Sequence, residues 1–565
     1  MTETTRPIST GKWCAVPCLV LAGVLAGCGS GGSVTEGGPL TMRRLTESQY
    51  RQTIADIFDA DIRIVGRFEP DSRRDGLLAV GTSLVSMTPA GFEQYDAMAR
   101  DIAAQVVDEE RRSRLPCAPR AMNAPDDECA SRIVAEYGRR LFRRPLAPEE
   151  LESRVRLAAE ATRTLGEFYA GLEYALASLL SSPEFLFRVD RPAASMKSAD
   201  ARPLDAYSKA TRLSYFLWNT APDEELLAAA ESGELDTRKG LERQVDRLLA
   251  SPRLEAGTRA FFADLLRLDA FDELAKDTTI YPLFSAKLMA DAREQTLRVI
   301  VDHLVTRRGD FRDLFTTRSS FMTRTLGMLY GVPVRSRDDW EPYEFPEDSP
   351  RAGLLTQVSF VAMHAHPGRS SPTLRGKFVR ETFLCQEVPP PPANVDFTMD
   401  AADAHLKTAR QRLARHNEDP VCAGCHKLMD PLGLGFEQFD GLGAFRTHEA
   451  GMAIDASGEL DGVPFEDAVG LGRVMRENPQ VSACFVRNVY QYAVGRRVTP
   501  GEQPFLEYLE RTFAKDGYRW PALLKRIATS DAFHTVSTVD EAPAAPEGPE
   551  TKTVAVARDD RESDT

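Results

Sequence analysis

Residues 416–446 read HNEDPVCAGCHKLMDPLGLGFEQFDGLGAFR, and within them Cys422, Cys425 and His426 form a C-x-x-C-H motif. This is the attachment motif of c-type haem, in which two thiols bond to the vinyl groups and the histidine ligates the iron. The chain's own Cys and His content gives on the order of 0.002 chance matches. The motif therefore predicts one covalent haem c, with His426 as its proximal ligand.

Two other uses of the motif remain open. A zinc site would take both thiolates, His426 and a fourth ligand such as His416. Alternatively, Cys422 and Cys425 would form a disulfide or a redox-active pair. A zinc ribbon normally offers a second C-x-x-C, and the sequence contains none. Haem is therefore favoured over zinc or a disulfide.

The sixth iron ligand decides which chemistry a haem here would support. Methionine as the sixth ligand favours electron transfer, whereas an open position allows small-molecule chemistry. Met429 is discounted, because three residues after His426 on a continuing helix it would lie on the same side of the haem. The remaining distal-ligand candidates are Met452, His366, His364, His416 and His448.

The N-terminus predicts export. Arg6 and Lys12 precede an apolar run, residues 13–27, that is short for a membrane span but typical of a signal peptide. The run ends directly before Cys28, as in bacterial lipoprotein signals, although an ordinary secretory signal would look similar. We expect Cys28 to be lipidated and to anchor the protein in the outer membrane, facing the periplasm or the cell surface.

Export would place the remaining cysteines in an oxidising compartment. Cys117 and Cys129 lie close together around a proline-containing loop, which predicts a local disulfide. Cys385 and Cys484 are then left over. They are expected to form a second bridge across the haem module, with two buried free thiols as the alternative.

Composition limits the class of protein. The chain has 565 residues, a formal net charge of −14, 42% hydrophobic and 27% charged residues. These values fit a globular protein rather than a bundle of membrane helices. The acidic balance argues against a nucleic-acid partner. Glycine-rich phosphate loops and the Gly-x-Ser-x-Gly elbow are absent from the sequence, so nucleotide binding and a hydrolase triad have no support.

Apolar periodicity predicts a mostly α, multi-module protein. Thr46 followed by Gln49 indicates a capping box, and residues 335–350 resemble a linker or lid. Four acids near the motif (Asp430, Glu437, Asp440 and Asp455) are expected to be solvated turn residues. We expect a signal peptide at 1–27, a flexible linker at 28–40, helical modules at 41–115 and 116–195, a helical domain at 203–334, a cytochrome-like module at 350–450, a helical module at 451–535 and a disordered tail at 536–565.

Short motifs spread along the chain resemble those of cytochrome-like exported proteins of planctomycetes and myxobacteria, which are built from consecutive domains of unknown function. The resemblance covers nearly the whole mature chain. It implies an exported, mostly helical protein with a c-type-cytochrome-like module near the C-terminus, and it implies no substrate. The motifs lie at residues 44–58, 140–146, 179–186, 213–218, 353–356, 371–377, 422–433 and 492–496.

The favoured function is electron transfer by a membrane-anchored mono-haem protein with an unidentified redox partner. An enzymatic version is a haem-dependent oxidoreductase that takes electrons from a small molecule or glycan. The competing class is a structural or binding lipoprotein whose C-x-x-C-H motif holds zinc or a disulfide.

Overall fold

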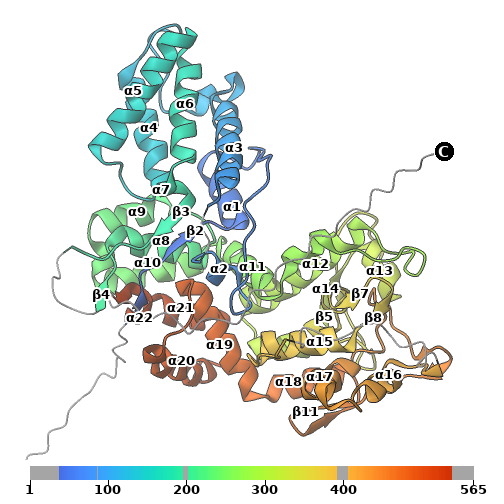
Figure 1. The fold of residues 1–565 in the computed structure, drawn as a ribbon. Helices are drawn as coiled ribbons and strands as arrows, with labels where there is room; N and C mark the ends of the chain where they lie inside the picture. Colours follow the sequence, from blue (N-terminus) through green and yellow to red (C-terminus); the bar gives the residue numbers. More distant parts are fainter. Residues whose placement is uncertain (1–36, 85–86, 195–200, 391–404, 538–565) are drawn as a thin grey trace, which may run out of the picture. The chain divides into compact units, whose positions relative to one another are not determined.

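Helices account for most of this computed structural model, which describes residues 37–84, 87–194, 201–390 and 405–537 (Figure 1). The mostly α fold predicted from the sequence is therefore confirmed. The expected signal peptide 1–27 and the lipidation site Cys28 lie outside the described residues. In the part of the chain that is described, no helix is long and apolar enough to cross a bilayer.

Helices from the N-terminal third enclose a first hydrophobic core, in which Tyr50, Tyr95 and Phe185 pack together. The first helix begins with the predicted capping box, since the Thr46 hydroxyl accepts from the Gln49 amide while Gln49 Oε1 accepts from the Thr46 amide. The elements are β1 (Gly38–Pro39), β2 (Met42–Arg44), α1 (Glu47–Ile57), α2 (Leu78–Gly81), α3 (Pro89–Val107), α4 (Asp127–Phe142), α5 (Pro148–Leu165), α6 (Phe168–Leu180), α7 (Pro183–Leu186) and β3 (Phe187–Val189).

A second, larger core continues from the middle of the chain into its C-terminal part. Stacked aromatic rings lie at its centre, where Phe311 and Phe485 are 3.7 Å apart between centroids. Its middle elements are β4 (Ala201–Pro203), α8 (Ala206–Leu217), α9 (Glu224–Glu231), α10 (Arg238–Ala250), α11 (Leu254–Leu265), α12 (Ala286–Val301), β5 (Ser319–Met322), α13 (Arg324–Tyr330) and β6 (Glu341–Glu344).

The C-terminal elements complete the second core and contain the C-x-x-C-H motif. Helix α15 ends in a π-helical turn, Val379–Phe383, ahead of Cys385. The elements are α14 (Val358–Met363), β7 (Ala365–His366), β8 (Arg369–Ser370), α15 (Pro372–Phe378), α16 (Ala409–His416), α17 (Pro420–Leu434), β9 (His448–Glu449), β10 (Met452–Ala453), β11 (Gly458–Leu460), β12 (Val463–Phe465), α18 (Ala468–Glu477), α19 (Pro479–Val494), α20 (Gln503–Lys515), α21 (Trp520–Ala528), α22 (Asp531–His534) and β13 (Thr535–Ser537).

Short strands join segments that are far apart in sequence, and three of them lie in stretches expected to be a linker, a tail or a lid. The expected linker 28–40 contains β1, and the expected tail 536–565 begins inside β13. These strands pair in parallel, and β4 pairs antiparallel with β13 on the other side. The expected linker or lid 335–350 contains β6, which pairs with β5. Sequence patterns missed them because strands of two to four residues carry too little periodicity to detect.

A buried ion cluster links the same distant segments. Asp190 accepts two hydrogen bonds from Arg212, at 3.1 and 2.7 Å, and one from the Thr41 hydroxyl. Arg212 also donates to the Phe533 carbonyl, 2.5 Å away. Burial disfavours ionisation of Asp190, but Arg212 and Arg43 outweigh burial and hold its pKa well below the usual range.

Both expected disulfides are present. Cys117 bonds to Cys129 across a 12-residue separation, and Cys385 bonds to Cys484 across 99 residues. The second bond connects the segment after α15 to α19. The C-x-x-C-H helix therefore lies inside a covalently closed loop.

Replacing Asp190 with asparagine is expected to lower the free energy of unfolding by about 3–5 kcal/mol, because Arg212 and Arg43 would stay buried without their counter-charge. Urea denaturation measures the change. Since the pKa of Asp190 is depressed in the fold, its contribution is present above about pH 4 and is lost on acidification. On acidification, the free energy of unfolding of the variant should therefore fall less than that of the wild type.

The control for that prediction is Glu242→Gln, which breaks an exposed pair with Arg238. An exposed pair of this kind contributes at most about 1 kcal/mol, so little change is expected. Equal losses in the Asp190 and Glu242 variants would contradict the structural role given to Asp190.

The two disulfides should differ in their contribution to stability. The chain-entropy relation gives about 3 kcal/mol for the short Cys117–Cys129 loop and about 5 kcal/mol for the Cys385–Cys484 loop. Paired serine substitutions, compared by chemical denaturation, measure both. A larger loss from opening the shorter loop would contradict this account.

Candidate functional site

Helix α17 carries the whole C-x-x-C-H motif. It begins at Pro420, a residue favoured at the first helical position because its missing N–H would have no intrahelical partner there. Cys422, Cys425 and His426 lie in its first two turns. Both cysteines are free thiols and are half-buried. One helix thus presents two reachable thiols and an adjacent imidazole.

Helix α15 packs against α17, and two glycines at the contact bring the two backbones unusually close. A Cβ on Gly376 of α15 would lie 1.9 Å from the Met429 carbonyl oxygen, and a Cβ on Gly433 of α17 would lie 1.7 Å from that of Pro372. Any larger residue at either position would collide with backbone. The two glycines therefore determine how closely the helices approach.

Arg375 joins α15 to the segment that follows α17. Its side chain is fully buried, and it donates to the carbonyls of Phe436 and Phe439, both at 2.8 Å, and of Val361 and Asp440. Burial lowers the pKa of this arginine to about 10. Its hydrogen bonds hold the chain in place immediately beyond the motif helix.

His426 is anchored through one ring nitrogen. Its Nδ1 lies 2.9 Å from Asp430 Oδ2, one helical turn further along, and the Thr373 hydroxyl of α15 donates to Asp430 Oδ1 at 2.9 Å. The side chain of Asp430 is 2% exposed, and that of His426 is 20% exposed. This arrangement leaves Nε2 as the ring nitrogen for a metal ligand bond. It matches the pattern in which a ligating histidine gives its other nitrogen to a carboxylate.

The acids near the motif differ from the expectation of four solvated turn residues. Asp430 and Glu437 are buried, and burial raises the pKa of Glu437. Asp440 accepts from the amides of residues 442–444 in a turn. Asp455 alone of the four is exposed. The expectation was wrong for Asp430 and Glu437 because each has partners on α15 or β8 that are distant in sequence.

Among the distal-ligand candidates, His416 is the one whose ring contacts His426. The ring centroids are 4.6 Å apart in an edge-to-face arrangement. His416 ends α16, which packs against α17. The other surface candidates, His448 and Met452, lie exposed on the β9–β10 hairpin, whose Glu449 holds α16.

His364 and His366 precede α15. The ring of His364 stacks on Phe378, with centroids 4.0 Å apart, and burial lowers its pKa to about 3. Phe378 lies on a different face of α15 from Gly376 and Thr373, which contact α17. The structure therefore does not bring His364 to His426. His366 is exposed in the β7–β8 hairpin.

The thiols lack the features of a redox pair or a preformed metal cage. Desolvation and the nearby Asp419 raise the pKa of the Cys422 thiol, whereas a catalytic C-x-x-C needs a lowered one. Among the described residues, no group of three or more His, Cys, Asp or Glu side chains is arranged to hold a metal ion. Free thiols beside an anchored imidazole fit the needs of c-type haem attachment.

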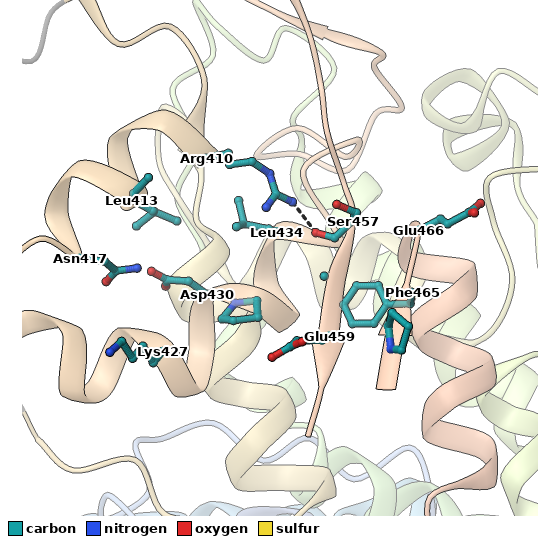
Figure 2. Close-up of a pocket in the computed structure, with 14 residues that line it drawn as sticks. Arg410, Leu413, Asn417, Lys427, Asp430, Leu434, Ser457, Glu459, Phe465 and Glu466 are labelled. Atoms are coloured by element: carbon teal, nitrogen blue, oxygen red, sulfur yellow. Dashed lines mark hydrogen bonds between the residues drawn. The ribbon is translucent and has the colours of Figure 1, made fainter. Parts of the chain in front are cut away.

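A pocket of about 750 Å³ lies beside the motif helix, between α16, α17 and the β11–β12 hairpin. Figure 2 shows Asn417 and Asp430 pointing toward one another on one side, with Phe465 on the other. Neither cysteine of the motif nor His426 lines this pocket. Asp430 connects the two regions, since it contacts His426 and also forms part of the pocket wall.

Sequence reasoning missed Asp430 and Thr373 as parts of the site. The signal for Asp430 was present, since His426 and Asp430 are four residues apart and so share one face of a helix. Thr373 left no such signal, because its partner is 57 residues away.

Comparison with known proteins finds five family models along the chain. Each is described as a protein of unknown function. A family named PSCyt3 (DUF1588) covers the C-x-x-C-H motif, at residues 351–449. The other four match residues 43–108 (DUF1587), 129–190 (DUF1595), 204–332 (DUF1592) and 461–533 (DUF1585).

No curated protein and no solved structure matches the chain. The five models follow one another in the order expected from the sequence motifs, and together they span most of residues 43–533. The chain belongs to the family of proteins built from these five consecutive domains of unknown function.

Proposed function

We propose that this protein is an exported c-type cytochrome-like lipoprotein that carries one haem and transfers single electrons in the cell envelope. Cys422 and Cys425 would bind the haem covalently, and His426 would ligate its iron. The observation that carries the proposal is the anchoring of His426 Nδ1 by a buried carboxylate, beside two free thiols on the same helix. Histidine ligands of metals characteristically have such a partner.

The chain's residues have separable tasks. Each thiol adds its sulfur to one carbon of a vinyl group and its hydrogen to the other, so attachment is a simple addition without loss of electrons. His426 offers Nε2, and Asp430 keeps the ring oriented. A haem held here would supply a one-electron iron couple. An exported one-electron donor and acceptor would complete the transfer.

The sixth ligand is part of the same proposal. His416 is favoured over His364, His366, His448 and Met452 because its ring contacts His426. Two imidazoles in contact would have to separate to admit an iron between them, so the α16 end that carries His416 would have to shift. Lipidation at Cys28 and outer-membrane anchoring complete the proposal.

A second candidate is a non-haem structural or binding lipoprotein. The observation that favours it is the contact between His416 and His426, which places a second imidazole at the motif helix. Two imidazoles and two thiols are the ligand set of a Cys₂His₂ zinc site. The donor atoms would need to move together to close that site, since no such cluster exists among the described side chains.

The test is a visible spectrum of the full-length protein produced in a host that matures c-type cytochromes. We expect a reducible Soret band that survives acid–acetone extraction, and one haem per chain in a pyridine haemochrome assay. Cys422→Ser with Cys425→Ser should remove the covalently bound colour, and Cys117→Ser with Cys129→Ser should leave it unchanged. A colourless wild-type protein containing stoichiometric zinc or a Cys422–Cys425 disulfide would replace this proposal with the second candidate.

A further inference from the structure

The partner of His426 Nδ1 is a buried acid rather than a neutral group. Asp430 is 2% exposed, and its two oxygens are both engaged, one by His426 and the other by Thr373. A backbone carbonyl would orient the ring as well as a carboxylate does. A carboxylate also brings a negative charge next to His426, and the question is what that charge does at the site.

The hydrogen-bond chemistry determines the state of the ring. The Thr373 hydroxyl donates to Asp430 Oδ1. With Asp430 as the acceptor in both contacts, His426 Nδ1 donates to Oδ2, and Nε2 keeps its lone pair for a ligand bond. The carboxylate draws that proton toward itself, which increases the electron density that the ring offers at Nε2.

We propose that Asp430 is a positioning residue that also sets the redox balance of the site. It orients His426 and, through its buried charge, favours the oxidised iron over the reduced iron. This inference rests on the proposed function. A haem held by His426 would supply a one-electron couple, so that on oxidation one electron would pass to an exported one-electron acceptor while His426 keeps its Nδ1 proton. The site would gain one positive charge in this step, and a nearby negative charge would stabilise it.

Because Asp430 is buried, its charge acts on the site more strongly than the charges of the neighbouring exposed acids. Glu459 and Glu466 line the same pocket as Asp430, but both are exposed, and water and salt screen their charges. Lys427 is also exposed. Asp430 is only 2% exposed although it forms part of the pocket wall, so its charge acts on His426 at lower effective dielectric than theirs.

Thr373 provides a second test, because it acts on Asp430 and not on His426. Its hydrogen bond withdraws charge from the carboxylate. Removing it leaves more charge to act through Oδ2 on the ring. Thr373 and Asp430 substitutions should therefore shift the redox balance in opposite directions, which general loosening of the site would not do.

The experiment is a spectroelectrochemical titration of the full-length, haem-loaded protein and three variants. Asp430→Asn keeps the side-chain shape and removes the charge. We expect it to raise the ferrous-to-ferric ratio at a fixed potential at least tenfold, which is about 59 mV for one electron. Thr373→Val should lower the ratio by a smaller factor. Glu459→Gln, which removes a charge from the pocket wall without touching His426, should change it less than twofold.

The outcomes separate this inference from the proposed function. A colourless wild-type protein means that the proposed function is wrong. A haem-loaded protein in which Asp430→Asn and Glu459→Gln give the same ratio means that Asp430 does not set the redox balance, while haem binding stands. If Asp430→Asn fails to fold, Thr373→Val decides. A ratio that rises or stays constant in that variant overturns the inference.

Discussion

The short distance between α15 and α17 is the constraint on which the candidate site depends. Gly376 and Gly433 have no side chains at the contact, so each helix packs directly on the backbone of the other. At this range Thr373 reaches Asp430, and Arg375 reaches the carbonyls beyond the end of α17. A helix pair separated by ordinary side chains would place both groups too far away to bond. His426 is thus oriented by Asp430, and Thr373 of the neighbouring helix α15 holds Asp430 in place.

The sequence predicted the parts of the fold that depend on local chemistry. Thr46 with Gln49 predicted a capping box, and cysteine spacing in a chain expected to be exported predicted the short disulfide. The C-x-x-C-H spacing identified the segment that carries the candidate site. Contacts between distant segments could not be predicted from the sequence. Examples are the pairing of β1 with β13 and the hydrogen bond from Thr373 to Asp430, because each joins residues that are brought together only by folding.

Two of the acids near the motif were expected to be exposed and are buried, because each has bonding partners elsewhere in the chain. Asp430 and Glu437 are polar residues in a glycine-rich segment, and such residues are mostly exposed. In this protein each is buried against partners from earlier in the chain, and Glu437 pairs with Arg446 as well. Asp190 follows the same rule, since Arg212 and Arg43 accompany it into the interior. In all three cases, burial of the acid depends on partners that neutralise or bond it.

The closed loop between Cys385 and Cys484 has a consequence for how the chain matures. Four cysteines in the C-terminal half permit three ways of forming two bonds, and the fold uses one bond while leaving Cys422 and Cys425 unpaired. In an oxidising compartment the unpaired thiols would compete for Cys385 and Cys484 through thiol–disulfide exchange. Conversion of Cys422 and Cys425 to thioethers would end that competition. Attachment of the proposed haem would then also protect the Cys385–Cys484 disulfide from thiol–disulfide exchange.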